Sequence, residues 1–213
     1  MLTQENEKVP AILNAWFSGS EAGYSIADVL FGDQNPSGKL SATFPRSVGQ
    51  VPIYYSHKNT GRPLANKEGK FEKFRSNYLD ERNEPLFPFG YGLSYTTFKY
   101  DNLKVSTAKL KSGNKMQVSV QLANTGKFDG SEVVQLYVRD LVGSVTRPVK
   151  ELKGFQKVSL KKGESKNIVF DISVEDLKFY NSDLKYEAEA GAFEVFIGGS
   201  SDAELKQSFE LVK

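Results

Sequence analysis

The sequence predicts a mainly β protein: an antiparallel β-sandwich in its second half, preceded by a partial α/β segment and long loops. Three observations support this prediction. Apolar and polar residues alternate along several segments after residue 96, a helical spacing of apolar residues precedes residue 32, and a Pro-, Gly- and aromatic-rich segment, 85–98, separates the two patterns. We therefore expect three parts, residues 1–48, 49–95 and 96–213.

The first part predicts a strand, a helix and a second short strand. Residues 10–16 are almost continuously apolar, as in a buried strand of an α/β sheet. Ser20 can cap a helix whose apolar residues recur on one face and which Gly32 can end. Residues 40–44 form another extended segment, closed by Pro45. Because one helix and two short strands cannot cover both faces of a sheet, this part is only a partial α/β unit.

The second part predicts loops that end in a rigid joint. Residues 49–84 are polar and irregular, with an isolated extended piece at 51–55, so we expect long surface loops. Segment 85–98 then combines prolines and glycines with several aromatic rings. A flexible linker would be rich in glycine and serine without such rings, so this aromatic joint is expected to be packed and rigid.

The third part has the period of two that is typical of half-buried strands. Apolar residues alternate with polar ones along 116–122, 168–172 and 193–197, and further strands are expected at 133–139 and 149–160. About seven strands separated by turn signals over ~115 residues indicate an antiparallel β-sandwich. Residues 173–177 predict one short helical turn between the sheets.

Composition excludes several classes of function. The chain has 213 residues, with 28 Lys and Arg against 26 Asp and Glu, and the two signs are interspersed, so neither nucleic acid nor a membrane is expected as a partner. Without cysteine there can be no disulfide and no thiolate nucleophile. Residues 1–8 lack the pattern of a signal peptide. If this chain belongs to an exported protein, we expect the export signal to lie outside this sequence.

Local motifs offer little catalytic chemistry. His57 is the only histidine, so a nucleophilic triad or a general base would have to be built around it, and a loop-bracing role is the alternative. One histidine and no cysteine leave only carboxylates as other metal ligands, and we expect neither a metal nor a cofactor. Glu21 can simply stabilise the start of the helix through the helix dipole.

Several multi-residue motifs follow one another along residues 9–213. They are Trp16–Gly23, Ala27–Gly32, Asn35–Leu40, Thr43–Pro45, Tyr54–Pro63, Pro88–Thr96, Asn124–Gly126, Arg147–Phe155 and Phe196–Gly198. Together they resemble the C-terminal part of glycoside hydrolase family 3 β-glucosidases, of the periplasmic bacterial type. Because the motifs occur in the same order, the resemblance is more specific than any single glycine motif.

The resemblance implies a barrel domain and an α/β sandwich domain before a fibronectin type III-like, that is immunoglobulin-like, β-sandwich. Residues 1–48 would be the C-terminal remnant of the α/β domain, and residues 96–213 the whole fibronectin type III-like domain. Family members hydrolyse terminal β-D-glucosyl residues with retention, using two carboxyl groups about 5 Å apart. The family nucleophile is an Asp followed by Trp, whereas the only Trp here, Trp16, follows Ala15. The acid/base Glu falls before Met1, and Glu21 matches a different position.

The resemblance therefore implies an accessory chain without catalytic residues, inactive by itself, from a periplasmic or secreted parent. His57 and Arg62 would lie near the substrate in that parent. A β-xylosidase remains open as a rival specificity, because the sugar-binding barrel is missing. The alternative function is an independent carbohydrate-binding or protein-interaction module. That module would need exposed aromatic residues, whereas Phe155, Phe170 and Phe193 are expected to face the core.

The remnant also predicts self-association. Burying one large apolar side chain contributes roughly 1.5–3 kcal/mol, and the absent partners would leave several such side chains exposed. These residues are Ile12, Leu13, Trp16, Ile26 and Leu30. The chain is expected to pair through them, or to dock onto a polypeptide that carries the missing part.

Overall fold

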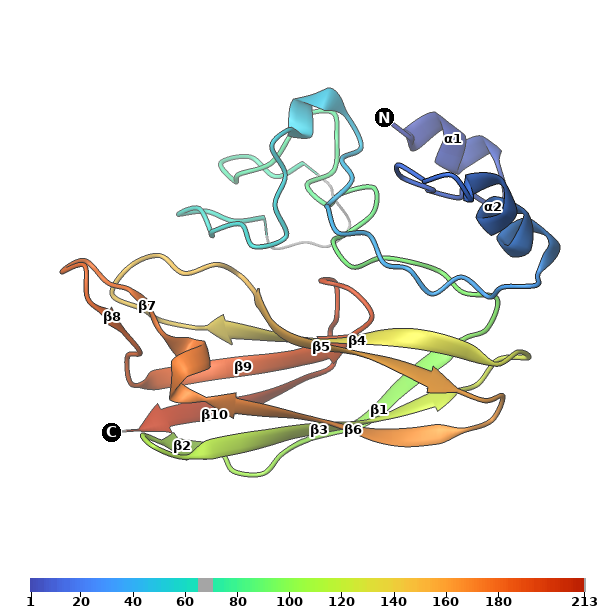
Figure 1. Cartoon of the computed structure of the whole chain (residues 1–213). Coiled ribbons are helices and arrows are strands. Elements are labelled where there is room, and N and C mark those ends of the chain that lie inside the picture. The colour runs from blue at the N-terminus through green and yellow to red at the C-terminus, as the bar shows by residue number, and fades with distance from the viewer. Residues whose placement is uncertain (65–70, 213) are drawn as a thin grey trace.

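The computed structural model describes residues 1–64 and 71–212, and a β-sandwich occupies the second half of the chain (Figure 1). Within these residues there are seven strands of seven or more residues and three shorter ones. They are β1 (Phe98–Val105), β2 (Lys109–Lys111), β3 (Lys115–Asn124), β4 (Gly130–Asp140), β5 (Glu151–Leu160), β6 (Ser165–Ser173), β7 (Phe179–Tyr180), β8 (Tyr186–Glu187), β9 (Gly191–Gly198) and β10 (Lys206–Val212). The mainly β fold class predicted from the sequence is confirmed.

The long strands form two sheets that enclose one core. One sheet has the order β1-β3-β6, the other has the order β2-β10-β9-β4-β5, and β7 pairs only with β8. All pairings are antiparallel except that of β10 with β2, which is parallel and departs from the expected all-antiparallel sandwich. The sheets close around a shared interior, which buries one face of β3, β6 and β10 and both faces of most of β9.

Alternation decides which side chains enter this core. Along β3, Met116, Val118, Val120 and Leu122 are fully buried while the residues between them are more exposed. The same period places Ile168, Phe170 and Ile172 of β6 inside. Phe155 was expected to face the core with Phe170 and Phe193, and this expectation is wrong: Phe155 is 67% exposed. Phe155 lies opposite Gln135 in the register of β4 and β5, on the outer face of the sheet.

Two α-helices precede the sandwich, α1 (Thr3–Lys8) and α2 (Ala22–Phe31). Gly32 ends α2 in the left-handed conformation with φ 88°, as the sequence indicated, because glycine adopts this geometry without steric strain. The helix begins one residue later than expected, with Glu21 and not Ser20 at the N-cap position. A short 3₁₀ helix, η1 (Val48–Gln50), follows. A second one, η2 (Val174–Leu177), is the expected helical turn.

Two expected extended elements are absent from the structure. Residues 10–16 form no strand, and neither do residues 51–55. An isolated strand cannot satisfy its backbone hydrogen bonds, and no described segment pairs with either of them. The short segment at 40–44 does make one antiparallel bridge, between Phe44 and Phe87. Within the predicted loop 49–84, residues 65–70 lie outside the described residues.

Residues 1–64 and 71–95 form a third layer on the outer face of the five-stranded sheet (Figure 1). Gln135 and Tyr137 of β4 point away from the core. The amide of Gln135 donates hydrogen bonds to the carbonyl oxygens of Gly90 (3.3 Å) and Gly199 (2.7 Å). Within the aromatic joint, the ring of Phe87 stacks on Tyr91 with centroids 5.1 Å apart. The joint is thus packed against the sheet, as its composition indicated.

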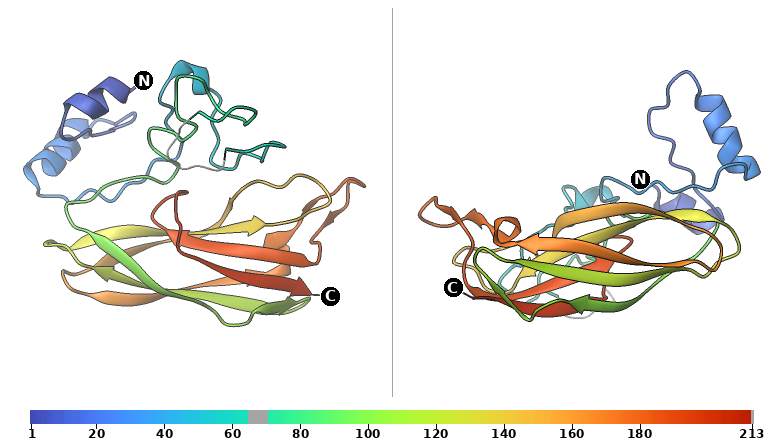
Figure 2. Two further views of the ribbon diagram at one scale, coloured as in Figure 1. Left: turned by 180° about the vertical axis from the view of Figure 1, so that it is seen from behind. Right: turned by 60° about the horizontal axis from the view of Figure 1, so that its bottom comes forward.

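The N-terminal part carries an exposed apolar surface. Helix α2 projects away from the sandwich in the right-hand view of Figure 2. Ile12, Leu13, Trp16 and Leu30 are exposed as expected, and Ile26 is half-buried. Phe17, Tyr24 and Phe31 are exposed in the same part of the chain. Self-association through this surface stays a prediction, which light scattering can check: a monomer at every concentration would contradict it.

Candidate functional site

The two residues assigned to the substrate rim lie on one exposed loop. His57 and Arg62 both belong to segment 54–63. This segment lies above the end of the sandwich at which β4 ends and β5 begins (Figure 1). His57 Nδ1 is 3.2 Å from the carbonyl oxygen of Tyr54, to which it donates when Nδ1 carries the proton. The carbonyl of Arg62 accepts the backbone N–H of Ser76 at 2.8 Å. Among the described contacts, none joins the side chains of His57 and Arg62 to each other.

Backbone pairing and one tyrosine fix this loop to the sandwich. Val149 N–H donates to the carbonyl of His57 at 2.9 Å, next to a bridge between Lys58 and Pro148. The ring of Tyr55 stacks on Phe89 of the aromatic joint, with centroids 4.5 Å apart, and its hydroxyl accepts the N–H of Leu152. The loop that carries His57 is therefore a docked segment, anchored at 55–58.

A charged cluster supports the segment on which the loop rests. Arg147 Nη2 pairs with Glu151 Oε2 at 2.7 Å, and Arg147 Nε lies 3.7 Å from Asp140 Oδ2. The guanidinium carbon lies 4.0 Å from the ring centroid of Phe179, at the start of the β7–β8 hairpin. Burial raises the pKa of the Asp140 carboxyl, while the backbone N–H of Val142 and the charge of Arg147 act in the opposite direction. The cluster thus links Asp140, the last residue of β4, to Glu151, the first residue of β5.

This cluster does not provide the carboxyl pair of a glycosidase. A retaining enzyme needs one carboxylate as nucleophile and one carboxylic acid as proton donor, about 5 Å apart across a cleft. Asp140 and Glu151 are instead both directed at the single guanidinium of Arg147. A carboxylate paired in this way is not free to attack a sugar carbon.

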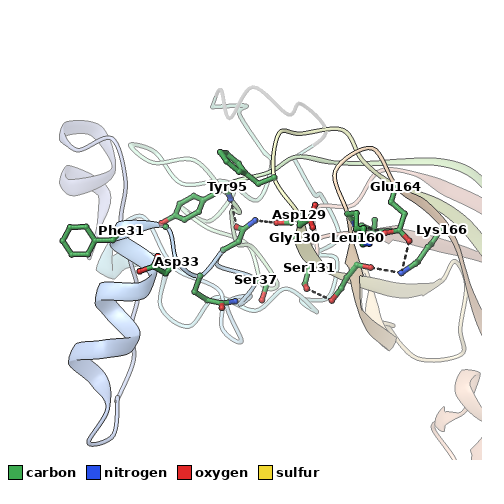
Figure 3. Close-up of a pocket in the computed structure, with 16 residues that line it drawn as sticks. Phe31, Asp33, Ser37, Tyr95, Asp129, Gly130, Ser131, Leu160, Glu164 and Lys166 are labelled. Atoms are coloured by element: carbon green, nitrogen blue, oxygen red, sulfur yellow. Dashed lines mark hydrogen bonds and ion pairs between the residues drawn. The ribbon is translucent and has the colours of Figure 1, made fainter.

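A cleft lies between the end of α2 and the edge of the sandwich (Figure 3). The side chain of Asn35 bridges the two walls of this cleft, because its amide nitrogen donates a hydrogen bond to the carbonyl oxygen of Asp129 at 2.8 Å. The backbone N–H of Lys161 and then the side chain of Lys166 lower the pKa of Glu164, whereas a general acid needs a raised pKa. Glu164 therefore does not fit the role of a general acid in this cleft.

Among the described residues, no group of three or more histidine or carboxylate side chains is placed to hold a metal ion. None of the helices formed by these residues is long and apolar enough to cross a membrane.

Sequence reasoning missed the tertiary contacts of three residues, Tyr55 and Arg147 at the loop and Lys39 where the first part of the chain meets the sandwich. Tyr55 and Arg147 stand inside motifs that were recognised, but nothing local indicated which contacts they make. Lys39 forms an ion pair of 2.9 Å with Glu132, a residue 93 positions away (132 − 39). Pairs so distant in sequence leave no periodic signal, and only the packing of the first part on the sheet brings them together.

Comparison with family models divides the chain into two matches. Residues 1–95 match the model of the glycosyl hydrolase family 3 C-terminal domain. Residues 132–201 match the model of the fibronectin type III-like domain. The two matches occur in the order that the motifs had indicated.

Similar proteins extend these matches along the chain. A periplasmic β-glucosidase of Salmonella typhimurium is 54% identical over 211 residues, 99% of this chain and 27% of that protein. A β-xylosidase of Formosa agariphila is 46% identical over 198 residues, 93% of this chain and 26% of that protein. A β-glucosidase from Listeria innocua, solved with glucose, superposes with a TM-score of 0.92 at 43% identity, covering 100% of this chain and 29% of that one. The chain thus spans about a quarter of the length of these relatives.

Proposed function

The chain belongs to glycosyl hydrolase family 3, and we propose that it is the C-terminal, non-catalytic portion of a retaining β-glucosidase. The observation that carries the proposal is the 54% identity with the Salmonella typhimurium β-glucosidase along 99% of this chain. Glucosides are favoured over xylosides because the β-xylosidase relative is less similar, at 46%. A structural neighbour solved with laminaribiose adds support for a β-linked glucoside as substrate.

An activity assay tests this proposal. The purified chain is expected to release no nitrophenol from nitrophenyl β-glucoside, because its sequence contains no Asp-Trp pair, the nucleophile motif that the resemblance implies. The polypeptide that joins this chain to a barrel and a complete α/β domain is expected to hydrolyse the same substrate. Turnover by the purified chain would contradict the non-catalytic role. Faster turnover of the xyloside by the joined polypeptide would contradict the specificity.

The proposed role of the chain is to hold a loop at the rim of the parent's active site. Its sandwich and aromatic joint form a rigid base, and loop 54–63 is docked on that base through Tyr55. We assign the parent to the periplasm or to the secreted proteins, in line with its periplasmic relative. We propose that the chain divides into three parts, residues 1–48, 49–95 and 96–213.

The rim assignment of His57 and Arg62 predicts a defined kinetic change. In the joined polypeptide, His57→Ala and Arg62→Ala are each expected to raise KM for an aryl β-glucoside roughly threefold to tenfold, with kcat within about twofold. Both residues would contact the bound substrate without taking part in bond cleavage. Lys58→Ala, on the same loop, is the matched control and should leave both constants unchanged. Unchanged KM in the His57 and Arg62 variants would refute the assignment.

A further inference from the structure

The β7–β8 hairpin presents two tyrosine rings side by side to solvent. Tyr180 and Tyr186 are directly opposite in its antiparallel register, so their side chains share one face. Their ring centroids are 5.0 Å apart, and the ring planes are inclined by 43°. Tyr180 is 66% exposed and Tyr186 is 55% exposed. We call these two side chains the tyrosine pair.

The hairpin that carries the tyrosine pair is held in place at its turn. Asn181 Oδ1 accepts the backbone N–H groups of Asp183 and Lys185, both at 3.0 Å. Asn181 Nδ2 donates to Glu187 Oε1 at 2.7 Å, across the two strands. Asn181 thus accepts two backbone N–H groups of the turn and also links the turn to β8. The spacing of the two rings is set before any ligand binds, which lowers the entropic cost of binding.

The base of the hairpin is fixed to the sandwich. Phe179 is buried under the guanidinium of Arg147, on the face opposite to the tyrosine pair. Beyond β8, Glu189 accepts the backbone N–H of Ser144 at 2.8 Å, and the Ser144 hydroxyl donates to the same carboxylate. The Ser144 hydroxyl and then its backbone N–H lower the pKa of Glu189, so the carboxylate stays charged and the contact persists at neutral pH.

The tyrosine pair contributes little to the fold. The core of the sandwich is complete without it, because Phe170, Phe193 and Phe209 are buried inside the two sheets. Phe155, the exposed aromatic on β5, has no ring neighbour among the described residues. Two large rings kept together in water on a rigid hairpin are instead typical of a binding surface.

The chemistry of the pair favours a sugar chain. Tyrosine offers an apolar ring face and a polar hydroxyl, which suits a ligand with apolar C–H faces and peripheral hydroxyl groups. The charged pair Glu175 and Lys178, 2.7 Å apart, directly precedes the hairpin. Two rings are far less than the roughly 800 Å² per partner of a stable protein interface, so a folded protein is a poorer fit.

We propose that the tyrosine pair binds a β-linked gluco-oligosaccharide by stacking against successive sugar rings. The ligand class rests on the proposed function, since β-glucosides are the proposed substrates of the parent. The pair is linked through Arg147 to the segment that supports loop 54–63, at the same end of the sandwich (Figure 1). The tyrosine pair therefore provides a second binding contact for a long substrate, separate from the catalytic residues of the parent.

Calorimetric titration of the 213-residue chain with cellohexaose and laminarihexaose tests the proposal, and it needs no catalytic activity. The chain is expected to bind at least one of the two with millimolar or tighter affinity. Tyr180→Ala and Tyr186→Ala are each expected to weaken binding roughly threefold to tenfold, and Tyr180→Phe and Tyr186→Phe to retain it, because stacking uses the ring. Maltohexaose, which has α linkages, is expected to bind more weakly.

Phe155→Ala is the matched control, because it removes a similarly exposed ring elsewhere on the sandwich and should leave binding unchanged. Unchanged thermal midpoints of the alanine variants exclude unfolding as the cause of lost affinity. The proposal is overturned if the chain binds neither β-linked hexaose, or if the two tyrosine substitutions leave affinity as it is. Equal binding of maltohexaose would overturn the ligand class. A chain that binds sugar while the joined polypeptide lacks glucosidase activity would refute the proposed function alone.

Discussion

Glu132→Ala is expected to lower the free energy of unfolding of the chain by about 3–5 kcal/mol. Glu132 pairs with Lys39 Nζ at 2.9 Å, and the two side chains are only 7% and 13% exposed. Lys39 Nζ also donates to the carbonyl of Gly92, and the hydroxyl of Tyr100 donates to Glu132. Removing the carboxylate leaves a buried ammonium without its counter-charge, at the place where the first part of the chain meets the sandwich. Urea unfolding followed by circular dichroism measures the change.

Two further variants separate this effect from other causes. The double variant Lys39→Met with Glu132→Leu is expected to recover most of the loss, because it removes both buried charges. Asp101→Ala breaks the exposed pair of Asp101 with Lys99, 2.7 Å apart, and is expected to cost less than about 1 kcal/mol. Equal losses for Glu132→Ala and Asp101→Ala would contradict the importance of burial.

Gly90→Ala is expected to destabilise the chain by about 2–5 kcal/mol, from backbone strain and overpacking together. Gly90 has φ 80°, a left-handed conformation that side chains rarely adopt. A β-carbon at this position would lie 2.1 Å from Gln135 Oε1, so the amide that fastens the aromatic joint to β4 would have to move. Thermal or urea unfolding shows the loss, and the hydrogen exchange of the joint should rise with it.

Gly113→Ala is the control for this prediction. Gly113 has the same φ of 80°, but a β-carbon there would meet no atom within 4 Å. Its substitution is expected to cost about 1–2 kcal/mol from backbone strain. The difference between the two variants measures the close approach of the aromatic joint to the sheet. No difference would mean that Gln135 adjusts freely and that the joint is not tightly packed.

Much of the sandwich followed from local patterns. The alternation along 116–122 and 168–172 identified β3 and β6 and their buried faces, because a strand buried on one side must alternate. Gly32 marked the end of α2 for a similarly local reason. The same reasoning misplaced Phe155, which lies on the outer face of the edge strand β5 at a position that stays exposed. It also predicted a strand at 10–16 from composition, without a partner strand to pair with it.

The candidate site depended far more on tertiary structure. The motifs named the family and placed His57 and Arg62 on a loop, but they did not show that Tyr55 anchors this loop on Phe89. The tyrosine pair was likewise invisible in the sequence, where Tyr180 and Tyr186 are two tyrosines among ten. Their proximity follows from the turn at Asn181, which aligns the two strands.

The aromatic joint shows both contributions. Its prolines, glycines and rings indicated a rigid connection from the sequence, because these residue types restrict the backbone and need burial. The surface that buries it, the outer face of the five-stranded sheet around Gln135 and Tyr137, was decided only by the fold. Local propensities act between neighbours in the chain. Contacts such as Gly90 with Gln135 or Lys39 with Glu132 arise only when distant segments pack together.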